Sequence, residues 1–188
     1  AWKPGRFGGG LSFDGGDNIS TSLTNNYTNG ITFEVWLRTT VVATSYFFGD
    51  VTTTAGSQAW VTASGTVSWL GYNSGSKFNP TSTRTVNDGN WHHVALVWDG
   101  TTTSNAVKVY IDAVLDTQAT STGTWTTAQC TVNIGDTRTT SCTTRAAGEQ
   151  FNGVLDEVAI FSSNRTAAQI SSDYNARRFK GNETNITG

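Results

Sequence analysis

Apolar and polar side chains alternate along several short segments of this chain, and turn residues separate those segments. In residues 31–38 every odd-numbered position is apolar, and this period of two predicts a strand with one buried face. Ser64 and Gly65 predict a hairpin turn between two such segments. Short strands at regular intervals are typical of a β-sandwich or jelly roll. The predicted strands are 11–13, 31–38, 46–48, 58–63, 66–72, 91–98, 106–112, 130–134 and 154–161.

Only one stretch has a helical pattern, from Thr166 to about Arg178. Ala167, Ile170 and Tyr174 recur there at spacings of three and four, and Asn164 or Thr166 is placed to cap the first turn. The sequence therefore predicts an all-β domain over residues 11–179 with one short C-terminal helix. A Gly-rich lead over 1–10 precedes it, and a polar tail over 180–188 follows it.

Composition narrows the class of protein. Thr, Ser and Asn together make up 65 of the 188 residues, whereas charged residues are only 14%. The net charge of −2 gives no electrostatic reason to expect nucleic acid as a partner, and no apolar run is long enough to predict membrane insertion. Because the sequence contains no Met and begins with Ala1, we expect a processed product or an excised domain.

Cys130 and Cys142 are the only cysteines, twelve positions apart. With no Cys-x-x-Cys pair or Cys/His cluster to suggest zinc, we expect one disulfide; two unrelated free thiols are the alternative. A disulfide and five Asn-x-Ser/Thr sequons favour an extracellular or cell-surface location, a virion surface included.

Four segments in order resemble the laminin-G-like branch of the concanavalin A-like lectin/glucanase superfamily, and together they span nearly the whole chain. They are Gly10–Asn18 around Phe-Asp-Gly-Gly-Asp, 31–38, Gly89–Gly100 with 109–112, and Phe151–Phe161 with 167–170. The resemblance implies a jelly roll of two antiparallel sheets. Ala113 departs from the family pattern, which usually has Gly after Asp112, so that hairpin turn is expected to differ.

Catalysis is not expected. Retaining glucanases of the superfamily share a Glu-x-Asp-x-x-Glu strand that places two carboxylates on one face, and none of the four Glu residues forms it. Asp156 and Glu157 are adjacent, so their side chains point to opposite faces of a strand. His92 and His93 are adjacent too, and are expected to be packed or hydrogen-bonded rather than to ligate one ion.

Calcium is the one cofactor that the resemblance suggests, in a structural role. Related modules often hold calcium near the chain termini with an Asp of the last strand, which corresponds to Asp156. Asp14 and Asp17, in the turn after the first strand, are weaker candidates. Alternatively, an Asp in this Gly-rich turn caps it through side-chain-to-backbone hydrogen bonds.

Exposed aromatic residues are the candidates for carbohydrate binding. Trp60, Trp69 and Tyr72 lie on one predicted hairpin, and Trp125 lies in a Thr/Gly-rich loop. Large aromatic side chains also fill the core of a two-sheet sandwich, which is the expected place of Trp36, Trp91 and Trp98.

Three functions remain open at this point. The preferred one is a non-catalytic, extracellular lectin-like module for binding or adhesion, with a glycan or a partner protein as ligand. The second is a structural surface protein that self-assembles, as a filament subunit, a surface-layer domain or a virion decoration domain. A glycoside hydrolase is the third.

Overall fold

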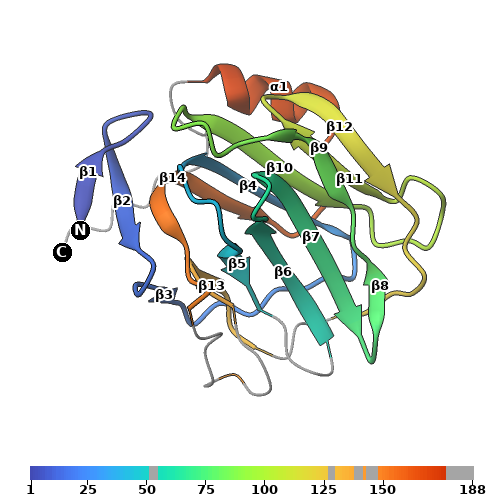
Figure 1. Ribbon diagram of the computed structural model, residues 1–188. Coiled ribbons are helices and arrows are strands. Elements are labelled where there is room, and N and C mark those ends of the chain that lie inside the picture. The colour runs from blue at the N-terminus through green and yellow to red at the C-terminus, as the bar shows by residue number, and fades with distance from the viewer. Residues whose placement is uncertain (51–54, 127–129, 138–141, 143–147, 177–188) are drawn as a thin grey trace.

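A computed structural model describes residues 1–50, 55–126, 130–137, 142 and 148–176. The chain forms two antiparallel sheets packed face to face, with one helix on the outside (Figure 1). Sheet A has the order β1-β2-β14-β4-β10-β11-β12, and its strands are Trp2–Pro4, Gly9–Asp14, Asn152–Phe161, Ile31–Arg38, His92–Trp98, Val107–Ile111 and Val114–Ala119. Sheet B has the order β3-β13-β5-β6-β7-β8, with β9 also paired to β7; these strands are Ile19–Ser20, Asn133–Ile134, Ser45–Gly49, Ala55–Val61, Thr66–Asn73, Ser76–Phe78 and Thr81–Thr85.

The core lies between the two sheets. On β4 the odd-numbered residues point into it, as the alternation predicts, and Phe33, Val35 and Leu37 are fully buried. The predicted all-β jelly roll is therefore confirmed. In the core Trp98 stacks on Trp125, and Phe78 packs against both of these rings and against Trp69.

Helix α1 (Ala167–Asn175) covers the outer face of sheet A. Thr166 is its N-cap, and the Thr166 hydroxyl and the Gln169 side chain form a capping box. Ile170 is fully buried and packs on Ala95, Val97 and Tyr110. On the same outer face Tyr174 of α1 stacks on Trp36, and Arg165 pairs with Glu34, which explains why these even-numbered positions of β4 are buried as well as the odd ones.

A charged network holds the helix to the sheet. The Arg165 Nε lies 3.0 Å from a carboxylate oxygen of Glu34, and the Arg165 guanidinium also pairs with Asp173 on α1. His93 Nε2 lies 3.3 Å from the other Glu34 oxygen, and both side chains are fully buried. Burial and the Glu34 charge raise the pKa of Asp173, while Arg165 opposes that rise. Buried charges need partners of this kind, so the network fixes how α1 docks.

The N-terminal end of the chain is more regular than the expected Gly-rich lead. Trp2–Pro4 pairs with Gly9–Leu11, so the Gly-rich lead forms a hairpin at the edge of sheet A, clearly seen in Figure 1. The expected tail over 180–188 lies outside the described residues. Within the part of the chain that the structure describes, no helix has the length and apolar character needed to cross a bilayer.

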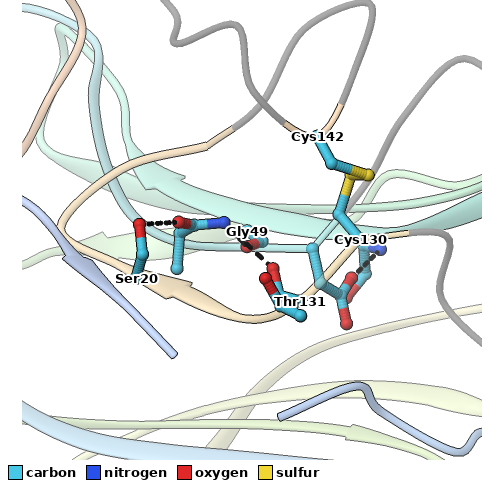
Figure 2. The surroundings of a disulfide bond; sticks show 8 residues. Ser20, Gly49, Cys130, Thr131 and Cys142 are labelled. Atoms are coloured by element: carbon cyan, nitrogen blue, oxygen red, sulfur yellow. Dashed lines mark hydrogen bonds between the residues drawn. A yellow bond between two sulfur atoms is a disulfide. The ribbon is translucent and has the colours of Figure 1, made fainter. Parts of the chain in front are cut away.

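The predicted disulfide between Cys130 and Cys142 is confirmed. Figure 2 shows its surroundings, where the Cys130 amide donates to the carbonyl of Asp50 at 3.3 Å. Nearby, Asn133 accepts from the Ser20 hydroxyl and donates to the carbonyls of Gly49 and Thr131. The disulfide therefore joins the segment that leads into β13 to Cys142, which follows that strand, and the Cys130–Asp50 hydrogen bond ties the same segment to the residue after β5.

Candidate ligand-binding face

The outer face of sheet B carries half-buried aromatic rings. On β6 the residues Ser57, Ala59 and Val61 point into the core, so Gln58 and Trp60 point outward. The sheet register places Tyr46 of β5 beside Trp60, and their ring centroids are 5.3 Å apart. Among the described residues, no helix covers this face. It therefore offers an aromatic platform to a ligand.

Polar groups surround that platform. The Thr137 hydroxyl donates to the Gln58 side-chain oxygen at 2.8 Å, which brings the segment after β13 across β5 and β6. Gly49 permits this approach, because a Cβ there would lie 2.4 Å from the Thr137 hydroxyl oxygen. The Tyr46 amide donates to the carbonyl of Glu149 at 2.7 Å. Burial, together with the Glu149 charge, raises the pKa of the Tyr46 hydroxyl, so that hydroxyl stays protonated and can donate.

The four predicted contact residues divide into two pairs. Trp60 and Tyr72 are half-buried and lie on the outer face of sheet B, Tyr72 on β7 opposite Gly56. Trp69 and Trp125 are only 1% and 7% exposed and belong to the core. The expectation that these two contact a ligand is therefore corrected. Trp69 alternates with the outward-pointing residues of β7, so its side chain points into the core. The Trp125 indole also points inward and stacks on Trp98.

Sequence reasoning missed Tyr46, Gln58 and Glu149. Two of them carried a usable signal, because Gln58 lies two positions before Trp60 in a predicted strand and Tyr46 begins an apolar run. No local pattern pointed to Glu149, which reaches the face through a long connection after β13.

The three candidate calcium ligands do not come together. β14 pairs with β2, as the resemblance implied, but Asn152 is the residue opposite Asp14. Asp156 is four positions further on, about 13 Å along the strand. Its two carboxylate oxygens accept from the amides of Phe7 and Glu157, each at 2.9 Å, and so fasten the N-terminal hairpin.

The turn after β2 uses its acidic residues differently. Asp14 accepts from the Gly16 amide at 2.9 Å, so it caps the turn, and Asp17 is exposed. In the described ranges, no three His, Cys, Asp or Glu side chains gather as a metal cluster. Asp14, Asp17 and Asp156 therefore do not fit a shared calcium ion, and calcium binding by this domain stays a prediction.

The two histidines have separate partners. His92 contacts Asp112 at 2.9 Å and Asp88 at 3.1 Å, whereas His93 contacts Glu34 beneath the helix. The hydrogen bond with Asp112 raises the pKa of His92 despite partial burial. The two rings serve different packing roles, and they form no common site.

The fold and the sequence agree on the family. The sequence signature of the Concanavalin A-like lectin/glucanases superfamily matches residues 13–171, and the chain belongs to that family. No curated protein matches the sequence.

Several solved structures share the fold at low identity. A heptameric SAP-like pentraxin from Limulus polyphemus is 18% identical over 90% of this chain and 83% of its own, with a TM-score of 0.70. The CBM40 of a Ruminococcus gnavus IT-sialidase, bound to α2,3 sialyllactose, is 13% identical over 86% and 97%, with a TM-score of 0.60. Domain 4 of AbnA, a Geobacillus stearothermophilus arabinanase, in complex with arabinotriose, is 19% identical over 92% and 79%, with a TM-score of 0.59.

Proposed function

We propose that this domain is a non-catalytic, extracellular binding module that recognises a glycan through the outer face of sheet B. The observation that carries the proposal is the pair formed by Trp60 and Tyr46, half-buried and side by side on a sheet face that no described helix covers. Aromatic rings of this kind combine a large apolar surface with fixed geometry. A sugar ring can lie on them through its C–H face.

Polar groups at the edge of the platform would orient such a ligand. Tyr46 on β5 and Gln58 on β6 lie on neighbouring strands, so the Tyr46 hydroxyl and the Gln58 amide belong to the same part of the sheet. Glu149 lies beside Tyr46. A few convergent polar groups on an apolar surface are the usual composition of a small-ligand site. They would select among sugars by their hydroxyl positions.

Two further observations support binding rather than catalysis, and a third supports an extracellular location. Glu34, one of the four glutamates, is fully buried with His93 and Arg165 as partners, so it has no access to a substrate. Two of the structures with this fold, domain 4 of an extracellular arabinanase and the CBM40 of a sialidase, hold a bound oligosaccharide. The disulfide favours an oxidising compartment.

Screening on a glycan array, followed by titration of any hit, tests the proposal. Trp60→Ala should weaken binding at least tenfold while leaving the fold intact, because its side chain is only half-buried. Trp2→Ala is the matched control, since Trp2 is 74% exposed on the distant N-terminal hairpin and its loss should change nothing.

Three results would count against the proposal. An array without hits, or a Trp60→Ala variant that binds as well as the wild type, would refute it. If a protein ligand binds instead and Trp60→Ala abolishes that, the face is right and the ligand class is wrong. Self-assembly stays a separate prediction, which sedimentation at high concentration would test.

A further inference from the structure

A cavity lies at the end of sheet A, and none of the residues that line it belongs to the aromatic platform of sheet B. It has a volume of about 420 Å³, and it is lined by residues 38–42, by Gly89 and by residues 152–154. Arg38 is the last residue of β4, and it is paired with Val154 on β14. Tyr174, next to the end of α1, stacks on Trp36. The cavity therefore opens where the helix stops covering the sheet.

Arg38 is the only charged side chain among the described residues that line this cavity. Its guanidinium lies over the ring of Trp91, 5.1 Å from the centroid, and no ion pair to a described acidic residue involves it. Stacking occupies one flat side of the guanidinium and leaves the in-plane N–H groups available. These form a planar fork that matches a carboxylate in a bidentate hydrogen bond.

Asp88, the acidic residue that directly precedes a lining residue of the cavity, already has hydrogen-bond partners of its own. Asp88 precedes the lining residue Gly89, but its carboxylate accepts from the amide and side chain of Asn90 and contacts His92. These hydrogen bonds lower the pKa of Asp88 to about 2. Its carboxylate oxygens therefore contact Asn90 and His92, and no ion pair joins Asp88 to Arg38.

Neutral groups complete the cavity. The hydroxyl of Thr40 and the side-chain amide of Asn152 make no hydrogen bond within the described structure, and both residues are exposed. Val42 and Val154 supply apolar walls. One cation, a hydroxyl and an amide beside small apolar surfaces suit a ring that carries a carboxylate and several hydroxyls.

The loop that forms one wall is held in place before any ligand arrives. The Val41 amide donates to the Thr39 hydroxyl at 3.1 Å, and the Gly89 amide donates to the Thr39 carbonyl at 3.0 Å. Asn87 donates to the carbonyl of Val41 at 2.9 Å. A wall fixed in this way costs little conformational entropy on binding.

We propose that this cavity binds an acidic sugar, a single glycan residue whose carboxylate is held by Arg38. The volume accommodates one sugar ring, and Thr40 and Asn152 hydrogen-bond its hydroxyls. The site is separate from the platform around Trp60, so the proposal stands independently of the function proposed above.

Two methyl glycosides that differ only at C6 test the proposal. Methyl β-D-glucuronide carries a carboxylate there, and methyl β-D-glucoside carries a hydroxymethyl group. Each is titrated into the ¹⁵N-labelled protein and followed by NMR. The glucuronide should bind about ten- to a hundredfold more tightly, the usual gain from a charge-assisted bidentate hydrogen bond. The shifts should concentrate on Gly89, the Trp91 indole and Gly153.

Three variants test whether the cavity recognises the carboxylate through the planar guanidinium group of Arg38 or only through positive charge. Arg38→Gln should remove the preference for the glucuronide, and Arg38→Lys should retain only a small part of it, because an ammonium has no planar fork. Lys108→Gln is the matched control, since it removes one positive charge from β11 at the opposite end of the ladder from Arg38. It should bind as the wild type does.

Each other result overturns the proposal. Equal affinity for the two glycosides, or an unchanged preference in Arg38→Gln, would show that no carboxylate is recognised there. Shifts confined to Tyr46 and Trp60 would place the acidic sugar on sheet B. Binding of a peptide with a free C-terminal carboxylate, but not of the glucuronide, would assign the cavity to a protein ligand. Trp60→Ala should leave glucuronide binding in the cavity intact. A failure of the cavity proposal can therefore be told apart from a failure of the function proposed for the sheet B platform.

Discussion

Asp50 is the group whose titration should most change the stability of the fold. It lies at the end of β5, has no exposed surface, and faces no cation among the described residues. Its carboxylate accepts hydrogen bonds from Asn25, from the Tyr27 hydroxyl and from the Ser57 amide. Burial raises the pKa of Asp50 from its ordinary value of 3.8 to about 6, although these three hydrogen bonds oppose the rise.

The direction of the pH effect follows from that value. Between pH 4 and pH 6 the folded protein holds a proton on Asp50 that the unfolded chain has lost, so the free energy of unfolding falls as the pH rises. The stability that the protonated carboxyl contributes is complete below pH 4 and lost above pH 6. A rise from 3.8 to about 6 corresponds to about 3 kcal/mol at 1.36 kcal/mol for each pH unit.

Asp50→Asn keeps the shape of the side chain and removes the titration. The free energy of unfolding is measured with urea at pH 4 and at pH 7 for both proteins. The difference between variant and wild type should shift by about 3 kcal/mol in favour of the variant from pH 4 to pH 7, whatever its value at pH 4. Asp17→Asn, at an exposed position, corrects for the loss of one negative charge. Parallel pH profiles for Asp50→Asn and the wild type would refute the reasoning.

Three further changes should alter stability by different mechanisms. Asp112 and Ala113 both have positive φ, 53° and 62°, so Ala113→Gly should raise the free energy of unfolding by about 1 kcal/mol, while Ala63→Gly should lower it, because Ala63 is a turn residue whose own φ is not positive. Replacing Cys130 and Cys142 by Ser should cost about 3 kcal/mol relative to the oxidised wild type in urea unfolding, as expected for a closed loop of this length, and the reduced wild type should unfold as the variant does. Trp69→Ala should cost about 3–5 kcal/mol and lower the melting temperature.

The sequence predicted the elements whose residues alternate strongly. The strand over 31–38 and the capped helix after Thr166 have the expected places, because buried Phe33 and Leu37 and the anchor Ile170 follow clear periods. The short strands β1, β3, β8, β9 and β12 were missed. They are polar or Thr-rich and lie at or near sheet edges, where pairing with a neighbour rather than burial determines the structure.

The aromatic residues show a second limit of sequence reasoning. Trp60 and Trp69 lie on the same hairpin and have the same chemistry, yet one is half-buried on the surface and the other is in the core. The Thr62–Gly65 turn decides this. It closes through a hydrogen bond from the Gly65 amide to the Thr62 carbonyl, with Gly65 at φ +87°, and is longer than the two-residue turn predicted from Ser64 and Gly65. The turn sets the register, and the register sets which ring faces outward.

The length of helix α1 explains why the two proposed sites occupy different sheets. Its nine residues span about 14 Å, whereas the eight residues of β4 span about 26 Å. The helix therefore covers sheet A from Val97 to Trp36, and Arg38 lies beyond its end. Sheet B has no such helix among the described residues, so Tyr46 and Trp60 stay partly exposed there, while on sheet A the end of β4 with Arg38 is left uncovered. A flat platform suits an extended glycan chain, and a small cavity with one cation suits a single acidic unit.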